Sequence, residues 1–173
     1  AVIGGGSFGT VIANIIAHNG HHTLLWMRDA DQVESLNITR QNAQYMPGLD
    51  LHEKVVATHD LKSVVEGVDL IFVAVPSSSF RAVVRQMKPF LQPGVILVSS
   101  TKGIEAVTFK LMSQILADEI PDARIAVLSG PNLAGEIAQR SPTGTVIASN
   151  DADIRKLVQD TLHSDTFHVY AND

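Results

Sequence analysis

Short apolar runs alternate with helix-like segments along nearly the whole chain. The apolar runs show little in-out alternation, which is typical of strands in a parallel sheet that is covered on both faces. These runs predict strands at residues 1–4, 23–27, 54–58, 69–75, 95–100, 124–130 and 144–150. The segments between them predict helices at residues 7–19, 29–42, 60–67, 77–91, 105–119, 132–140 and 151–162, with a loop at 43–53.

The alternation of strands and helices predicts a doubly wound α/β fold, with a mostly parallel sheet and helices on both of its faces. Local signals support individual helix boundaries. Gly20 follows Asn19 at the expected end of the first helix, and Asp29 is placed to cap the second, with Gln32 three residues later. No repeat, low-complexity segment or linker interrupts residues 1–173, so we predict one domain.

Composition narrows the classes of function. The chain is 45% hydrophobic and 18% charged, which fits a globular domain. It has no cysteine, and this excludes disulfides, thiol catalysis and zinc–cysteine sites. A formal charge of −5 without Lys/Arg clusters argues against a nucleic-acid partner. No apolar stretch has the roughly 18–20 residues of a membrane span, and no signal-peptide pattern is present, so we expect a cytoplasmic protein.

A glycine-rich loop joins the first expected strand to the first helix. Gly4, Gly6 and Gly9 match the pattern G-x-G-x-x-G, and the strand–loop–helix context makes this match a strong sign of dinucleotide binding. Gly4 permits the tight turn, Gly6 lets a diphosphate approach the backbone, and Gly9 lets the helix pack closely on the strand. The helix N-terminus offers unpaired N–H groups to the phosphates. The motif predicts a Rossmann-type domain that binds a dinucleotide.

The end of the second strand bears on which dinucleotide binds. Arg28 is placed to pair with a 2′-phosphate, whereas Asp29 could accept a ribose 2′-hydroxyl or cap the next helix. We interpret Asp29 as the cap and expect Arg28 to contact the adenosine end, so that NADP is tolerated and NAD is not excluded. A solvated surface arginine is the alternative.

Further candidates follow other strands, because ligands of open α/β sheets bind at the carboxyl ends of the strands. Pro76 and Ser77 are placed near the cofactor, although they could merely end a strand and begin a helix. Lys102 could bind phosphate or hydrogen-bond a reacting oxygen, or it could be an ordinary exposed lysine. Gly130 and Asn132 lie in a strand–turn–helix segment that could hold an anion or hydroxyl, or form an ordinary helix cap.

The histidines and one tyrosine add little to the chemistry. His18, His21 and His22 cluster, but the last two are expected to face opposite sides of a strand and no carboxylate has suitable spacing. We therefore expect no metal site. Tyr45 could cover the adenosine or pack into the core.

Taken together and in order, these motifs resemble one family. "VIGGGSFGTVIA", "LLWMRD", "QYMPG", "VAVPS", "STKGIE" and "LSGPNLAGEIAQRSPT" are similar to the N-terminal domain of NAD(P)-dependent glycerol-3-phosphate dehydrogenases over essentially all of the chain. The resemblance implies interconversion of sn-glycerol 3-phosphate and dihydroxyacetone phosphate by hydride transfer, which supplies glycerolipid synthesis. It implies cofactor contacts from Ser7, Phe8, Arg28, Tyr45, Lys102 and Ala134, and substrate contacts from Lys102, Gly130 and Asn132.

Departures from the family pattern qualify this resemblance. Phe8 replaces a more usual Trp or Tyr, and Asn132-Leu133 replace a Ser or Thr followed by Phe. The family continues into a helical substrate domain that carries its main proton donor and acceptor. We expect this domain to be absent from the chain, which begins within a strand, so Lys102 would support catalysis without performing it alone. The family is compatible with a homodimer.

Two other readings remain open at this point. The chain could be part of another two-domain dehydrogenase that acts on a hydroxy acid, although such enzymes are not expected to combine "STKGIE" with "LSGPNLAGE". It could instead be a non-catalytic NAD(H)-sensing domain, which would have no need for Lys102.

Overall fold

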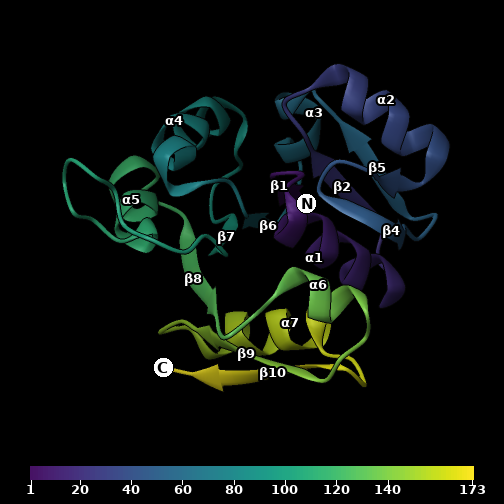
Figure 1. Cartoon of the computed structure of the whole chain (residues 1–173). Coiled ribbons are helices and arrows are strands. Elements are labelled where there is room, and N and C mark those ends of the chain that lie inside the picture. The colour runs from purple at the N-terminus through teal and green to yellow at the C-terminus, as the bar shows by residue number, and fades with distance from the viewer.

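The computed structural model describes residues 1–173 and contains one eight-stranded sheet between two layers of helices (Figure 1). In chain order its strands are β1 (Val2–Ile3), β2 (Thr23–Trp26), β5 (Val55–Thr58), β6 (Leu70–Val73), β7 (Ile96–Ser99), β8 (Arg124–Ser129), β9 (Thr143–Ala148) and β10 (Phe167–Asn172). Their spatial order is β10-β9-β8-β7-β6-β1-β2-β5. All pairs are parallel except β8–β9, so the predicted mostly parallel, doubly wound α/β fold is confirmed.

Helices cover the sheet from both sides. They are α1 (Ser7–His18), α2 (Ala30–Thr39), α3 (Leu61–Val65), α4 (Ser77–Met87), α5 (Met112–Glu119), α6 (Ala134–Ala138) and α7 (Ala152–Leu162), with a 3₁₀ turn η1 (Lys88–Phe90) after α4. One apolar cluster joins the sheet to α1, α2, α6 and α7, and a second joins its other face to α3, α4 and α5. No helix of the chain has the length and apolar character that crossing a bilayer would require.

Aspartates begin three of the helices. Asp29 accepts hydrogen bonds from the backbone N–H groups of Asp31 and Gln32, as predicted, and Asp60 and Asp151 cap α3 and α7 in the same way. Capping by Asp29 fixes the direction in which the chain leaves β2.

The predicted loop at 43–53 and the end of the predicted helix at 29–42 are partly wrong. In place of the helix end and of part of the loop, the strands β3 (Gln41–Asn42) and β4 (Met46–Asp50) form a small antiparallel hairpin. Helix α2 ends because Arg40 adopts a left-handed conformation at φ 58°. The hairpin packs on α1 through Met46 and Leu51, which belong to the same apolar cluster as that helix.

Two other predicted helices are shorter than expected. Only Met112–Glu119 of the predicted helix 105–119 is helical, and the segment before it is a loop closed by a bridge between Ile104 and Leu111. The predicted helix at 132–140 is reduced to α6. His21 and His22, expected in a strand, lie in the turn before β2.

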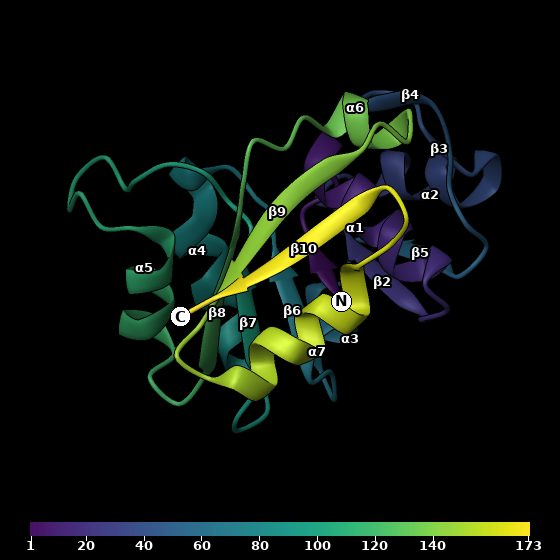
Figure 2. The ribbon, with the colours of Figure 1, turned by 90° about the horizontal axis from the view of Figure 1, so that it is seen from below.

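Strand β10 was not predicted, and the outer end of the sheet departs from the expectation of two covered faces. β9 and β10 lie side by side, with α7 packed on one face through Ile154 and Val158 (Figure 2). The opposite face is open: Val146 is 38% exposed and Tyr170 is 61% exposed. One helix serves this pair of strands, so only alternate residues of each strand are buried.

Candidate functional site

A large cavity lies where the carboxyl ends of the parallel strands meet. Its volume is about 960 Å³, in the range of ligand pockets. Residues that follow β1, β2, β6, β7 and β8 form its walls, which is where this fold class binds ligands. The lining includes Gly4, Gly6, Ser7, Phe8, Arg28, Tyr45, Pro76, Lys102, Asn132 and Ala134 from the predicted site, and among unpredicted residues Gln32, Gln44, Ser100, Thr101 and Leu128. Gly9 and Gly130, the other predicted residues, do not line the cavity.

The glycines of the loop occupy three different environments. Gly4 has a φ of +121°, which side chains rarely adopt, and it turns the chain out of β1. A Cβ on Gly9 would lie 1.9 Å from the carbonyl oxygen of Gly4, so the close packing of helix on strand is as predicted. A Cβ on Gly6 would meet no protein atom within 4 Å. Because Gly6 also lines the cavity, its open side faces space that a ligand can fill.

An unpredicted asparagine ties the hairpin to the glycine loop. The buried Asn42 amide donates to the Gly5 carbonyl oxygen and to Thr10 Oγ1, at 2.8 Å each. The Ser7 hydroxyl donates to the Tyr45 carbonyl oxygen at 2.9 Å. These bonds hold Tyr45 at the cavity wall and fix the loop at the start of α1. The role of Asn42 depends on contacts with residues that are distant in the sequence, so its sequence neighbours do not indicate this role.

The end of β2 places Arg28 and Asp29 as the sequence suggested. Asp29 lines the cavity but its Oδ1 accepts from the backbone N–H groups of Asp31 and Gln32, at 3.0 and 3.1 Å. Arg28 is exposed and also lines the cavity. Its guanidinium is thus available to an anion at this end of the site.

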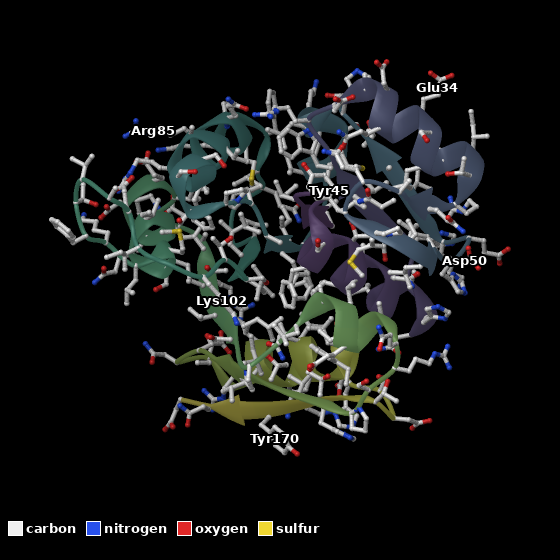
Figure 3. All side chains as sticks on the ribbon, viewed as in Figure 1. Glu34, Tyr45, Asp50, Arg85, Lys102 and Tyr170 are labelled. Carbon is white, nitrogen blue, oxygen red and sulfur yellow. The ribbon has the colours of Figure 1, made fainter.

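Lys102 and Gly130 are brought together from two strand ends. The Lys102 ammonium donates to the Gly130 carbonyl oxygen at 2.9 Å. An ammonium has three donors, so this bond leaves two for a ligand. Lys102 lies toward β8, whereas Tyr45 lies toward the α2 side of the molecule (Figure 3). The cavity therefore has one cationic group at each end, Arg28 beside β2 and Lys102 beside β7.

The Asn132 amide is already used within the protein. Its Nδ2 donates to the Gly144 carbonyl oxygen at 2.9 Å, and its Oδ1 accepts from Thr145 Oγ1 at 3.0 Å. Both partners belong to β9, so Asn132 fastens the turn after β8 to the sheet. Gly130 packs closely against the same strand, because a Cβ on Gly130 would lie 3.0 Å from the Gly144 carbonyl oxygen.

Pro76, Phe8 and Ala134 complete the walls. Pro76 lies directly before the first residue of α4 and lines the cavity, whereas β6 ends three residues earlier, at Val73. Phe8 and Ala134 pack against the apolar cluster that contains α1. These residues give the cavity its apolar surfaces.

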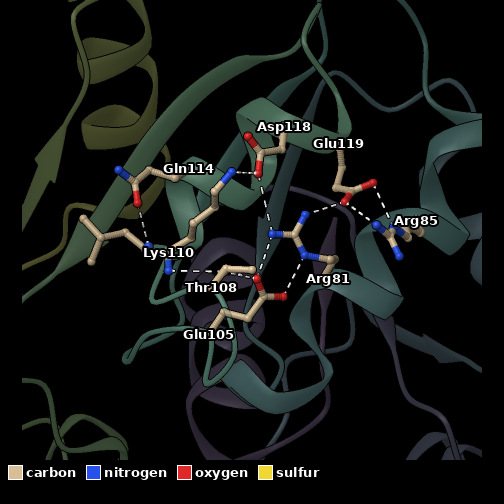
Figure 4. Close-up of polar contacts among 9 residues, drawn as sticks. Arg81, Arg85, Glu105, Thr108, Lys110, Gln114, Asp118 and Glu119 are labelled. Carbon is tan, nitrogen blue, oxygen red and sulfur yellow. Dashed lines mark hydrogen bonds and ion pairs between the residues drawn. The ribbon is translucent and has the colours of Figure 1, made fainter.

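An ion-pair network anchors the loop that follows Lys102. The Arg81 guanidinium of α4 bonds both carboxylate oxygens of Glu105, at 2.7 and 2.8 Å, and also Glu119 of α5, which in turn pairs with Arg85 (Figure 4). Lys110 pairs with Asp118. Hydrogen bonds from the arginines lower the pKa values of Glu105 and Glu119 from 4.5 to about 2 each. The network therefore holds the 103–111 loop against α4 and α5.

This network predicts a specific loss of stability in acid. Both carboxyl groups bind protons more weakly when folded than when unfolded, so their contribution is complete above about pH 4.5 and is lost as the pH falls toward 2. The Arg81→Met variant should show a smaller fall in the free energy of unfolding between pH 6 and pH 3 than the wild type does. Urea denaturation at several pH values measures this, with Lys156→Met, from an exposed pair with Asp160, as the control. Parallel pH profiles for Arg81→Met and wild type would refute the role of the network.

The chain contains no group of three or more His, Cys, Asp or Glu side chains that could hold a metal ion. The chemistry of the site thus rests on its cavity, the glycine loop, two cationic side chains and neutral polar groups.

Comparison with known proteins adds independent evidence. The model of the family described as NAD-dependent glycerol-3-phosphate dehydrogenase N-terminus matches residues 1–155. The chain is 54% identical over 172 residues to a glycerol-3-phosphate dehydrogenase [NAD(P)+] of Pseudomonas entomophila, covering 99% of this chain and 50% of the relative. It therefore spans about half the length of the curated relatives it matches.

Solved structures agree with the sequence comparison. The crystal structure of glycerol-3-phosphate dehydrogenase from Coxiella burnetii is similar with a TM-score of 0.94 and 35% identity, over 99% of this chain and 53% of that one. The enzyme from Saccharomyces cerevisiae is similar with a TM-score of 0.89 and 28% identity, over 98% of this chain and 55% of that one.

Proposed function

The chain belongs to the family of N-terminal domains of NAD-dependent glycerol-3-phosphate dehydrogenase. We propose that it is the cofactor-binding half of an enzyme that interconverts sn-glycerol 3-phosphate and dihydroxyacetone phosphate. Its similarity to glycerol-3-phosphate dehydrogenases [NAD(P)+] supports NAD(P) as the cofactor. Because the chain spans about half of those relatives, we propose that residues outside it complete the substrate site, and that the chain alone turns over slowly.

The observation that carries this proposal is the open side of Gly6 at the cavity wall. Ser7 and Phe8, the first residues of α1, line the same cavity, and a diphosphate fits such a helix start because the helix dipole favours negative charge there. The close packing at Gly9 and the hydrogen bond from Asn42 to Gly5 fix the shape of this loop through contacts within the protein. A dinucleotide would extend from Arg28 at one end of the cavity to Lys102 at the other.

Lys102 is placed to act at the reacting end. When bound, the nicotinamide supplies or accepts the hydride. The substrate oxygen gains negative charge as its carbon receives hydride, and the Lys102 ammonium would stabilise that charge. The bond to Gly130 limits where the ammonium can lie. Asn132 stays a predicted substrate contact, and its bonds to β9 support a role in shaping the turn.

Arg28 carries the proposal that NADP is tolerated. Its guanidinium lies exposed at the β2 end of the cavity, and Asp29 next to it is occupied as a helix cap. Replacing Arg28 with alanine should weaken NADPH binding by about 10- to 150-fold and NADH binding much less, because a charge-assisted bond to a 2′-phosphate is worth about 1.5–3 kcal/mol. Calorimetric titration of both cofactors measures this. An equal loss for both, or no loss, would remove the 2′-phosphate role, and failure of the wild type to bind either would overturn the proposed function.

A further inference from the structure

One buried hydroxyl, on a residue that lines the cavity, has no partner in the protein. Ser100 directly follows β7, is 7% exposed and lines the cavity. Its Oγ is buried and makes no hydrogen bond within the protein. Its backbone is fixed, because the Ser100 N–H donates to the Val73 carbonyl oxygen at 2.9 Å. The position of the hydroxyl is thus set by the sheet.

Threonine hydroxyls nearby and elsewhere in the fold are paired within the protein. Thr101 Oγ1 donates to the Val75 carbonyl oxygen at 2.7 Å, and Thr145 Oγ1 donates to Asn132. Thr10 Oγ1 accepts from Asn42. Buried polar groups in folded proteins nearly always find a partner, and one without a partner calls for a physical reason. A ligand that arrives in the cavity would supply that reason.

The alternation of side chains along β7 gives the direction of Ser100. Ile96 and Val98 belong to the apolar cluster on the α1 face of the sheet, whereas Leu97 belongs to the opposite cluster. Ser100, two residues after Val98, continues the first series. Leu128 of β8 lies in the cluster on that face and also lines the cavity. The hydroxyl therefore lies on the side of the sheet that carries the glycine loop.

The strand order places Ser100 at the reacting end of the cavity. Strands β2, β1, β6, β7 and β8 follow one another in the sheet, so the end of β7 is separated from Arg28 by β1 and β6. Lys102 lies two residues beyond Ser100. A dinucleotide whose adenosine lies beside β2 and whose diphosphate lies on the glycine loop would bring its nicotinamide to the end of β7.

We propose that the Ser100 hydroxyl forms a hydrogen bond with the carboxamide of the bound nicotinamide ring. This proposal rests on the proposed function. The carboxamide is the polar substituent of that ring and both donates and accepts, and a hydroxyl can pair with either of its atoms. One such bond beside Lys102 would fix which face and which edge of the ring meets the substrate. Ser100 is then a residue that recognises the nicotinamide and does not contact the adenosine half.

The test compares two ligands that differ in the nicotinamide. Wild type and Ser100→Ala are titrated by calorimetry with NADH and with ADP-ribose, which lacks the nicotinamide ring. Ser100→Ala should bind NADH about 3- to 10-fold more weakly, with unchanged affinity for ADP-ribose. The melting temperature of the unliganded variant should not fall, because the lost hydroxyl has no protein partner.

Ser99→Ala is the matched control. Ser99 is the neighbouring serine of the same strand, is 1% exposed and does not line the cavity, so its replacement should leave both affinities unchanged. Equal NADH affinity of Ser100→Ala and wild type, or an equal loss for NADH and ADP-ribose, would overturn the role of Ser100 while leaving the proposed function intact. Binding of neither ligand by the wild type would overturn both.

Discussion

The Gly9→Ala variant is expected to lose about 3 kcal/mol of folding free energy and most of its NADH affinity. An added Cβ would lie 1.9 Å from the Gly4 carbonyl oxygen and 3.4 Å from the Ala74 Cβ. Neither neighbour can move freely: Gly4 donates to the Trp26 carbonyl oxygen at 3.0 Å, and Ala74 donates to that of Ile3 at 2.8 Å. Helix α1 would have to shift away from the sheet, and the loop would shift with it.

Urea denaturation and calorimetric titration measure the two effects of Gly9→Ala. Gly135→Ala is the matched control, because Gly135 also lies in a helix, α6, and a Cβ there would meet no atom within 4 Å. This control should be neutral or more stable by up to about 1 kcal/mol, since alanine favours helix more than glycine does. A Gly9→Ala protein as stable as the wild type would show that the packing of α1 on the sheet is not tight.

The Lys102→Met substitution is expected to lower kcat for dihydroxyacetone phosphate reduction by about 100-fold or more, with a smaller change in the KM for NADH. The measurement uses a chimaera in which this chain replaces the matching half of the Pseudomonas entomophila relative, to which it is 54% identical. The ammonium would act mainly on the charge that develops on the substrate oxygen, so its loss affects the rate more than cofactor binding.

Two further variants make the Lys102 result specific. Lys102→Arg keeps the positive charge and should recover part of the lost rate, although its planar group cannot take the same place beside Gly130. Lys62→Met removes an exposed lysine of α3 that pairs with Glu66. Lys62 does not line the cavity, so its replacement should leave kcat unchanged. A kcat for Lys102→Met within about twofold of the unmodified chimaera would exclude an electrostatic role.

Features set by neighbouring residues could be predicted from the sequence. The turn at Gly4, the packing at Gly9 and the cap at Asp29 depend on a few adjacent positions, and the structure has all three. The strands that are covered by helices on both faces of the sheet were also predictable, because burial on both faces makes each of them a continuous apolar run. The position of Lys102 at the cavity follows from the general rule for strand ends in this fold class.

Features set by distant contacts could not be predicted in the same way. Residues 105–111 were predicted to be helical, but the conformation of this segment is fixed by Arg81, which precedes Glu105 by 24 residues. Asn42 acts through Gly5, 37 residues earlier. The orphan hydroxyl of Ser100 depends on which atoms of other strands surround it. None of these contacts leaves a periodic pattern in the sequence.

Strand β10 is a different kind of omission, because its signal was present. Phe167 and Val169 are buried, while the residues that alternate with them, such as Tyr170, face outward. This two-residue period is typical of a strand with one covered face. Continuous apolar runs identify only the strands that are covered on both faces, and β10 is covered on one.

Gly6→Ala tests the central claim, that the glycine loop forms a diphosphate cradle, most directly. Gly6 has an ordinary φ of −73°, and an added Cβ would meet no protein atom within 4 Å, so folding should be unaffected. The Cβ would occupy space at the cavity wall where the diphosphate is proposed to lie. We predict an unchanged melting temperature and at least about 10-fold weaker NADH binding by calorimetry, a loss of about 1.4 kcal/mol. Wild-type NADH affinity in a folded Gly6→Ala protein would contradict the account.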